Sequence, residues 1–221
     1  MDDMKETASD VLAQMREEHM GQKDAAPLEL YQQEFAAADP HVLSARSGVA
    51  YDAQRQVFQL HLIGRPLEVA WPSLECTFAD TGEAQRPNVQ ILMACLLLRG
   101  KLVESQGGFL SYPEIPWGDH YFKAFQGRCI YRFAGMYRGE DGVERFRQAA
   151  ERLGGTPAQA GDAAYDFEFV ETVIVRLILW EGDDEYPTTS QILFSDNTPL
   201  AFAAEELAAV GDVLLGTLKR A

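Results

Sequence analysis

The stretch Val173–Pro187, VIVRLILWEGDDEYP, decides most about the fold of this chain. Its first part is an apolar, β-branched run of the length that a buried strand needs, broken only by Arg176. The run ends at Trp180, and the acidic segment that follows, with Gly182 inside it, is typical of an exposed turn. We therefore expect a buried strand that leads into a solvated turn.

Two groups of strands are predicted, with helices between them. In the first, residues Gly48–Trp71 alternate between apolar and polar side chains around a turn at Gly64-Arg65, which indicates an antiparallel meander of about three strands. In the second, strands over Tyr165–Val170 and Gln191–Phe194 flank the strand Val173–Trp180. Strands clustered in this way are typical of an α+β fold with two antiparallel sheet regions.

Helical patterns account for most of the remaining chain. The stretch Pro87–Arg99 is apolar nearly all round, which predicts a helix at the centre of the fold. We expect one α+β domain over residues 1–221, with 154–162 as its weakest point if there are two subdomains. The flanking helices are predicted over Asp3–Met20, Pro27–Ala38, Trp117–Tyr137, Glu144–Leu153 and Ala203–Leu218.

The charge of the chain limits its partners. Nineteen basic and 34 acidic residues give a net charge of −15, while 47% of the residues are hydrophobic, as in a folded protein. The negative field repels nucleic acid phosphates and anionic lipid, so we expect neither a nucleic acid nor a membrane partner. It favours a basic protein or a cationic ligand.

The cysteines and the N-terminus predict a reduced, cytoplasmic location. Cys76, Cys95 and Cys129 form no CxxC pair, which argues against a zinc ribbon or a thioredoxin-like site and favours buried free thiols. The N-terminus lacks the apolar region of a secretory signal. The longest apolar run, Ile91–Leu98, is far shorter than the roughly 20 residues that span a bilayer.

The acidic turn is the candidate metal site. The carboxylates of Glu181, Asp183, Asp184 and Glu185 are the hard oxygen ligands that calcium and magnesium prefer. Their spacing differs from that of an EF-hand loop, and consecutive side chains on an extended backbone alternate in direction. A solvated turn is therefore the simpler interpretation, and cation binding is the alternative.

Arg176 is expected on the same strand face as Ile174, Ile178 and Trp180. A buried guanidinium on an apolar face needs a carboxylate or a ligand anion beside it. A structural ion pair is one interpretation, and an anchor for an anionic ligand is the other. The candidate carboxylates on the preceding strand are those of Asp166, Glu168 and Glu171.

The segment after Trp117 is the candidate ligand site. His120 lies beside Asp119 and follows a Gly/Pro-rich loop, which makes it the best candidate for proton transfer or metal ligation. On a helix, Tyr121, Phe125 and Arg128 share a face and would form a stacking platform with a cationic group, as aromatic cofactors or tetrapyrroles use. The alternative is that this aromatic stripe belongs to the core.

Several segments follow one another in an order that resembles a known family. They are Gly127-Arg128-Cys129, Leu153-Gly154-Gly155, LWEGDDEYP (179–187), ILFSDN (192–197) and the closing helix EELAAVGDVLL (205–215). Together they resemble the bacterial family called domain of unknown function 3786, over roughly Leu28–Leu218. The family is found mainly in anaerobes, and some relatives carry an iron–sulfur-type domain. This chain lacks such a cysteine cluster, so the resemblance does not imply cluster binding. The family has no established activity, so the resemblance implies no reaction.

Three functions remain open at the level of sequence, which contains no P-loop, GxGxxG, HExxH or GxSxG signature. The first is a non-catalytic accessory protein that holds a small molecule, or a metal-containing cofactor suggested by the resemblance, between the helix Trp117–Tyr131 and Trp180. The second is an enzyme with His120 as acid or base and Arg128 or Arg176 holding an anionic substrate. The third is a protein-interaction module whose acidic surface docks a basic partner.

Overall fold

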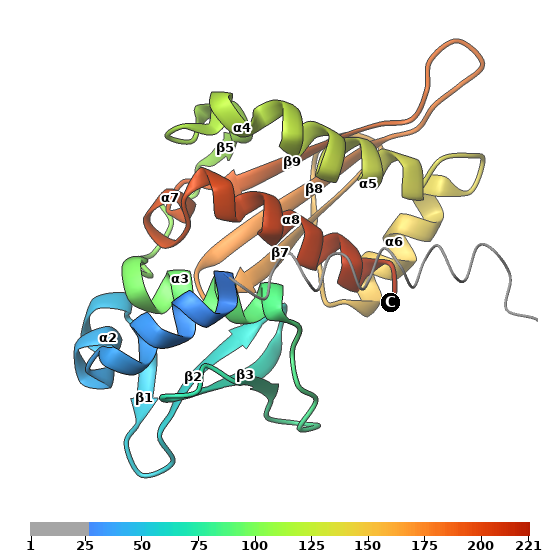
Figure 1. The fold of residues 1–221 in the computed structure, drawn as a ribbon. Helices are drawn as coiled ribbons and strands as arrows, with labels where there is room; N and C mark the ends of the chain where they lie inside the picture. Colours follow the sequence, from blue (N-terminus) through green and yellow to red (C-terminus); the bar gives the residue numbers. More distant parts are fainter. Residues whose placement is uncertain (1–26) are drawn as a thin grey trace, which may run out of the picture.

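The computed structural model describes residues 27–221 and shows an α+β fold built on two antiparallel sheets (Figure 1). The strand order is β1-β2-β3-β4 in the first sheet and β5-β9-β8-β7-β6 in the second. The predicted fold class is thus confirmed. The helix expected over Asp3–Met20 lies outside the described residues.

The first sheet is the predicted meander with one additional strand. β2 buries Phe58, Leu60 and Leu62 and exposes Gln59 and His61, as the alternating pattern indicates. The extra strand β4 is only three residues long and gives no readable alternation, so the sequence missed it. The strands are β1 (Ala50–Asp52), β2 (Val57–Leu62), β3 (Arg65–Ala70) and β4 (Cys76–Phe78).

Three helices pack near the first sheet, and α3 (Pro87–Arg99) has the predicted bounds. Residues 92–98 of α3 are all buried, which confirms its central place. The residues at 27–37 are helical, in agreement with the predicted helix, but Leu30, predicted to face inward, is 66% exposed. Helix α2 (Pro40–Ser47) was not predicted because it buries too few apolar side chains to show a period.

The second sheet contains the strand that opened the sequence analysis. β8 covers Val173–Trp180 as predicted and is paired on both sides, so it is the central strand. The acidic segment after it joins β8 to β9 as a hairpin. The other strands are β5 (Phe109–Ser111), β6 (Thr156–Ala158), β7 (Ala163–Val170) and β9 (Thr189–Ser195).

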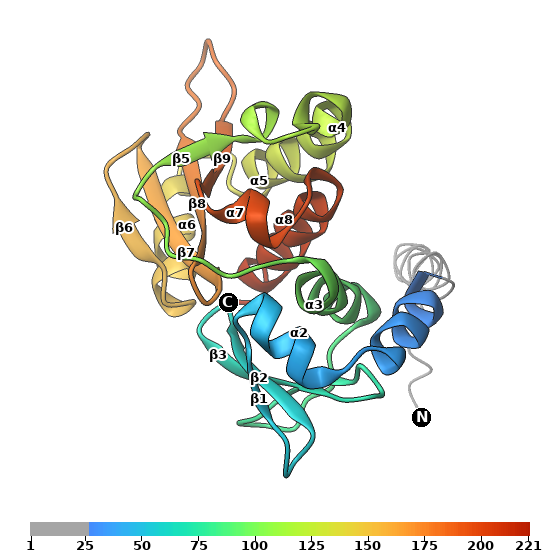
Figure 2. The ribbon, with the colours of Figure 1, turned by 90° about the vertical axis from the view of Figure 1, so that its left-hand side faces the viewer.

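Helices cover one face of the second sheet (Figures 1 and 2). The expected helix over Trp117–Tyr137 consists of α4 (Gly118–Phe125), a π-helical turn (Gln126–Ile130) and α5 (Tyr131–Met136). Helix α8 packs between this helix and α3. The remaining helices are a 3₁₀ turn (Tyr112–Glu114), α6 (Gly142–Arg152), α7 (Thr198–Ala201) and α8 (Ala204–Leu218).

The two sheets meet where β2 and β7 end. The Ile63 N–H donates to the Phe169 carbonyl at 2.9 Å, and the His61 N–H donates to Glu171 Oε1 at 2.6 Å. Buried side chains from both sheets belong to one hydrophobic cluster. The sheets are therefore joined by a continuous core, and a groove opens along the polar side of the junction.

Candidate functional site

A groove of about 670 Å³ lies where the two sheets meet. It is lined by β1, β2 and β3, by the connecting segment 102–104 and by the turn at 171–172. Junctions between structural units are common places for small-molecule sites, and this volume lies in the range of such sites. The groove is thus a candidate site with room for a small molecule.

The wall of the groove is held by a network around the β7–β8 turn. Glu171 has a left-handed backbone with φ of 41°, and one of its oxygens lies 3.3 Å from His61 Nδ1 in addition to accepting the His61 N–H. The Thr172 hydroxyl donates to the Val103 carbonyl at 2.8 Å, and the Asn197 amide donates to the same carbonyl at 2.7 Å. These contacts give the groove a fixed shape.

The lining of the groove combines apolar and acidic side chains. Pro66 is exposed and Leu102 is half-buried, and both contribute apolar surface. Glu68 forms a two-bond ion pair with Arg55, at 2.6 and 2.7 Å, so its charge is compensated. Glu104 has no such cationic partner within residues 27–221.

The pKa of Glu168 indicates that the electrostatic potential beside the groove is negative. Burial raises its pKa above the usual range, and the negative charges of Glu171 and Glu104 raise it further, while His61 opposes the shift. Among the described residues, no Lys or Arg lies within ion-pair distance of Glu168. Within residues 27–221, Glu104 in the groove and Glu168 beside it therefore carry uncompensated negative charge.

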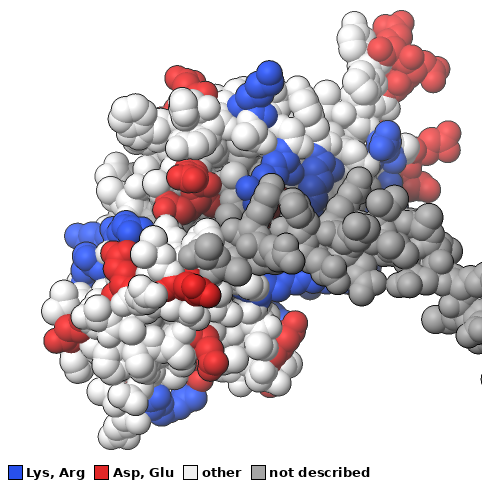
Figure 3. Space-filling view, viewed as in Figure 1, with Lys and Arg blue, Asp and Glu red and all other residues white. Residues whose placement is uncertain are grey.

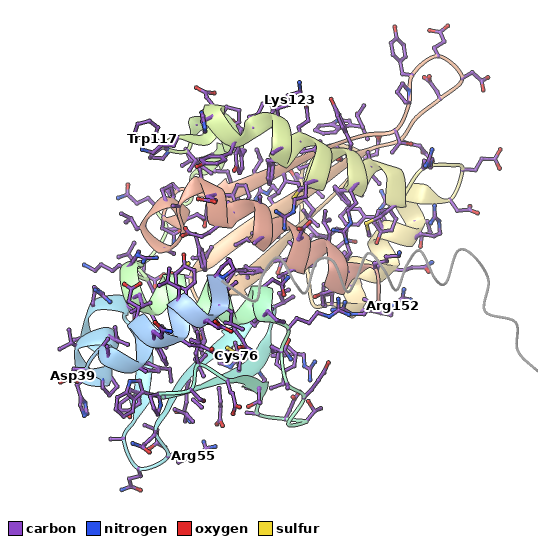
Figure 4. The ribbon with its side chains drawn as sticks, in the orientation of Figure 1. Asp39, Arg55, Cys76, Trp117, Lys123 and Arg152 are labelled. Atoms are coloured by element: carbon purple, nitrogen blue, oxygen red, sulfur yellow. The ribbon has the colours of Figure 1, made fainter. Side chains whose placement is uncertain are left out.

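A second hollow, of about 520 Å³ and wide open, lies at the start of α4. Trp117 and His120, two of the residues predicted for a ligand site, both line this hollow. Trp117 lies at the surface (Figure 4) and is 82% exposed. Trp117 has a φ of 67°, a conformation that is unusual for a tryptophan. The turn is tightly packed, because a Cβ on Gly118 would lie 1.9 Å from the Tyr112 carbonyl oxygen.

Tyr121, Phe125 and Arg128 were predicted to share one helix face, but their side chains lie in different environments in the structure. Tyr121 is half-buried and meets the His120 ring edge-on at 4.9 Å between centroids. Phe125 is fully buried and stacks on Tyr112 at 4.0 Å, so it is a core residue. The π-helical turn after Phe125 changes the helical phase, and Arg128 is exposed.

Trp180 and Arg176 face away from this helix. The Ser190 hydroxyl donates to the Ile130 carbonyl at 2.7 Å, and Ser190 is the strand partner of Leu179, so the helix lies on the Leu179 face of the sheet. Neighbouring strand residues point to opposite faces. The structure therefore does not bring Trp180 together with Trp117 and His120.

Arg176 forms a structural ion pair. Its Nε donates to Asp166 Oδ1 at 2.6 Å and its Nη2 to Asp166 Oδ2 at 2.8 Å. The guanidinium also lies 3.9 Å from the centre of the Phe109 ring. The sequence predicted Asp166, Glu168 or Glu171 as its partner. Asp166 is the partner because it lies directly opposite Arg176 in the β7–β8 register.

The acidic turn is ordered by its own backbone. Asp183 Oδ1 accepts the N–H groups of Glu185 and Tyr186 at 2.8 and 2.7 Å, and these bonds lower the pKa of Asp183. Glu181, Asp184 and Glu185 are exposed. Within residues 27–221, no group of three or more His, Cys, Asp or Glu side chains is arranged to hold a metal ion.

Sequence reasoning missed the groove. His61 and Glu171 are 110 positions apart, and neither stands in a motif. The sequence did show His61 on the polar face of its strand, but nothing in it indicates which carboxylate reaches that face. Only the junction of the two sheets brings His61, Glu104 and Glu171 together.

The three cysteines are free and buried, as expected. Burial raises the pKa of Cys95 and of Cys129 to about 12, and it raises the pKa of Cys76 as well. Since the thiolate is the reactive form, none of these thiols is suited to nucleophilic or redox chemistry.

Comparison with known proteins places the chain in a family. No curated protein and no solved structure matches it. In the part of the chain that the structure describes, no helix is both long and apolar enough to cross a membrane. The family whose description is "Domain of unknown function (DUF3786)" matches residues 39–217, which is most of the chain. The chain belongs to this family, as the order of its segments indicated.

Proposed function

We propose that the protein is a non-catalytic binding protein that holds a small organic cation in the groove between its two sheets. The observation that carries this proposal is the groove of about 670 Å³, whose wall is fixed by hydrogen bonds between distant segments. A site that is formed before the ligand arrives loses little conformational entropy on binding. The groove therefore suits recognition of a compact ligand.

The charge around the groove supports a cationic ligand. Glu104 and Glu168 have no cationic partner among the described residues, and the negative charges of Glu171 and Glu104 both act on Glu168. A bound ammonium or guanidinium group would compensate these carboxylates, while the aliphatic part of the ligand would contact Pro66 and Leu102. An amine or guanidine with a short hydrocarbon chain meets both requirements.

The test uses spermidine and agmatine as probes, with titration calorimetry on the full chain. Ala79 is exposed and lines the groove, so Ala79→Trp fills it without disturbing the core. We expect Ala79→Trp to abolish binding, and Glu104→Gln/Glu168→Gln to weaken it about tenfold or more. The matched control is Ala124→Trp, at an exposed alanine on α4.

The outcomes separate the parts of the proposal. Binding that persists in Ala79→Trp would place the ligand elsewhere and overturn the site. If Ala79→Trp abolishes binding but the double Glu variant does not affect it, the groove remains the binding site. The two carboxylates would then not recognise the ligand, and the proposal of a cationic ligand would be wrong. Native mass spectrometry of protein purified without oxygen from its own host would reveal a metal-containing cofactor as a stoichiometric extra mass.

Catalysis at His120 is the second candidate, because His120 lines a hollow beside the exposed Trp117. Neither arginine that the sequence offered as an anion anchor lines this hollow: Arg176 pairs with Asp166, and Arg128 with Asp212. Only the histidine therefore supports the enzyme hypothesis. A reaction whose pH profile disappears in His120→Ala would establish it.

We also propose a cytoplasmic location, which the three free, buried thiols support, since a reducing compartment keeps thiols unpaired. The net charge of −15 supports a basic protein as a macromolecular partner and disfavours nucleic acid. Fractionation of the native host, with detection of the protein in the soluble or the membrane pellet, tests the location.

A further inference from the structure

An arginine-rich surface lies where α8 packs against the π-helical turn and α5. Asp212 on α8 accepts hydrogen bonds from Arg128 Nε and, at 3.1 Å, from Arg132 Nη1. Asp212 is mostly buried, whereas Arg128 and Arg132 keep 52% and 37% of their side-chain surface exposed. One carboxylate thus holds two guanidinium groups in place while both remain accessible.

A third arginine, Arg220, follows the end of α8, about two helical turns beyond Asp212. A Cβ built on Gly216 would lie 3.9 Å from Arg132 Nη2 and 3.9 Å from Arg220 Nη1, and no other described atom outside the backbone of this helix and the neighbouring residues lies as near. The two nitrogens are therefore no more than twice that distance apart. A phosphate group fits a gap of this size: two of its oxygens would each accept one charge-assisted hydrogen bond of about 2.8 Å, one from each arginine.

We call the surface formed by Arg128, Arg132, Asp212, Gly216 and Arg220 the arginine saddle. Within residues 27–221, no carboxylate lies within ion-pair distance of Arg220, whose nearest polar partner is the Thr217 hydroxyl at 3.4 Å. Among the described residues, these three guanidinium groups have one carboxylate partner, which leaves a local surplus of two positive charges within residues 27–221. Figure 3 shows blue side chains gathered over α4 and α5, in a chain whose net charge is −15.

Gly216 is the residue that keeps the saddle open. It lies inside α8, where glycine weakens a helix, and its φ is not in the left-handed region that requires glycine. No backbone atom is close enough to exclude a side chain there. The absence of a side chain at Gly216 leaves space between the two guanidinium groups.

We propose that the arginine saddle binds a phosphate group, free or as the monoester of a small metabolite. The phosphate would accept hydrogen bonds from Arg132 Nη2 and Arg220 Nη1, and Arg128 would add to the attraction. A phosphate carries close to two negative charges near neutral pH, which matches the surplus charge of the saddle. Planar guanidinium groups are suited to oxyanions of this shape.

The test is a titration of the full chain with inorganic phosphate and with glycerol 3-phosphate, at an ionic strength kept constant with sodium chloride. We expect Arg132→Gln and Arg220→Gln each to weaken binding about tenfold or more. Arg55→Gln is the control, since Arg55 is also exposed and paired but lies on the first sheet.

Gly216→Leu separates a binding role from a structural one. Leucine favours the helix and fills the saddle, so phosphate affinity should fall at least tenfold while the unfolding temperature stays the same or rises. Equal affinity for both probes would identify phosphate itself as the ligand, and tighter binding of glycerol 3-phosphate would identify a monoester. Binding no stronger than that of chloride, or binding unchanged in all three variants, would overturn the proposal.

Discussion

Two arginine sites in this protein differ in how many guanidinium groups surround one carboxylate. On the open face of the second sheet, Arg176 meets the single carboxylate of Asp166 in two hydrogen bonds and packs against Phe109. In the arginine saddle, Arg128 and Arg132 share Asp212, and Arg220 stands beside them without a carboxylate among the described residues. The comparison teaches that the number of arginines per carboxylate matters more than the position of an arginine in the sequence. An arginine that shares its carboxylate with others keeps positive charge that a ligand can use.

The largest effect is expected at Arg176. Arg176→Ala removes two charge-assisted hydrogen bonds and the contact with Phe109, and it leaves Asp166 half-buried without a partner. We expect the free energy of unfolding to fall by about 2 kcal/mol, measured by urea denaturation. In a double-mutant cycle with Asp166→Ala, the coupling should be about 1 kcal/mol. A loss below about 0.5 kcal/mol would mean that the pair is not structural.

A smaller effect on stability is expected at Asp212. Burial raises the pKa of Asp212, and the opposing attraction of Arg128 and Arg132 does not outweigh it. The charged carboxylate therefore adds little net stability at neutral pH, and Asp212→Asn should change the free energy of unfolding by less than about 0.5 kcal/mol. Phosphate affinity should rise severalfold, because the local surplus of positive charge increases. A loss as large as that of Arg176→Ala would remove the distinction between the two sites.

The smallest effect on stability is expected at Glu168, which belongs to the negatively charged side chains beside the groove. The pKa of Glu168 is raised in the folded protein, so the folded state binds this proton more tightly than the unfolded state does. The resulting stability is complete below the unfolded pKa and is lost as the pH rises through the folded pKa. Glu168→Gln should therefore be slightly more stable than the wild type at pH 7 and equally stable below the usual pKa range of glutamate.

Glu114→Gln provides the control with the opposite sign. The Ser111 hydroxyl and N–H, both 2.7 Å from Glu114 Oε2, lower the pKa of this carboxyl. The folded state thus prefers the charged form, and the variant should be less stable than the wild type at pH 7, with the difference vanishing as the pH falls through the lowered pKa. Urea titrations at both pH values measure the two variants side by side. A shift of the same sign in both would contradict the electrostatic explanation.

The long elements could be predicted from the sequence, and the short ones could not. Helix α3 and strand β8 have the predicted bounds because each carries a full period of apolar residues. Strands β4, β5 and β6 are three residues long, and such segments show no periodicity that distinguishes them from loops. The π-helical turn after Phe125 is likewise not visible, so the face expected for Tyr121, Phe125 and Arg128 did not form.

The sequence by itself determined the fold class, the central helix and strand, the burial of the thiols and the need of Arg176 for a partner. These properties depend on local periodicity and on the cost of burying charge, which are present in the order of residues. The tertiary structure decided which carboxylate Arg176 meets, and it assembled the groove from His61, Glu104 and Glu171 and the saddle from Arg132 and Arg220. Such sites depend on contacts between residues many positions apart, and those contacts exist only once the sheets and helices have packed.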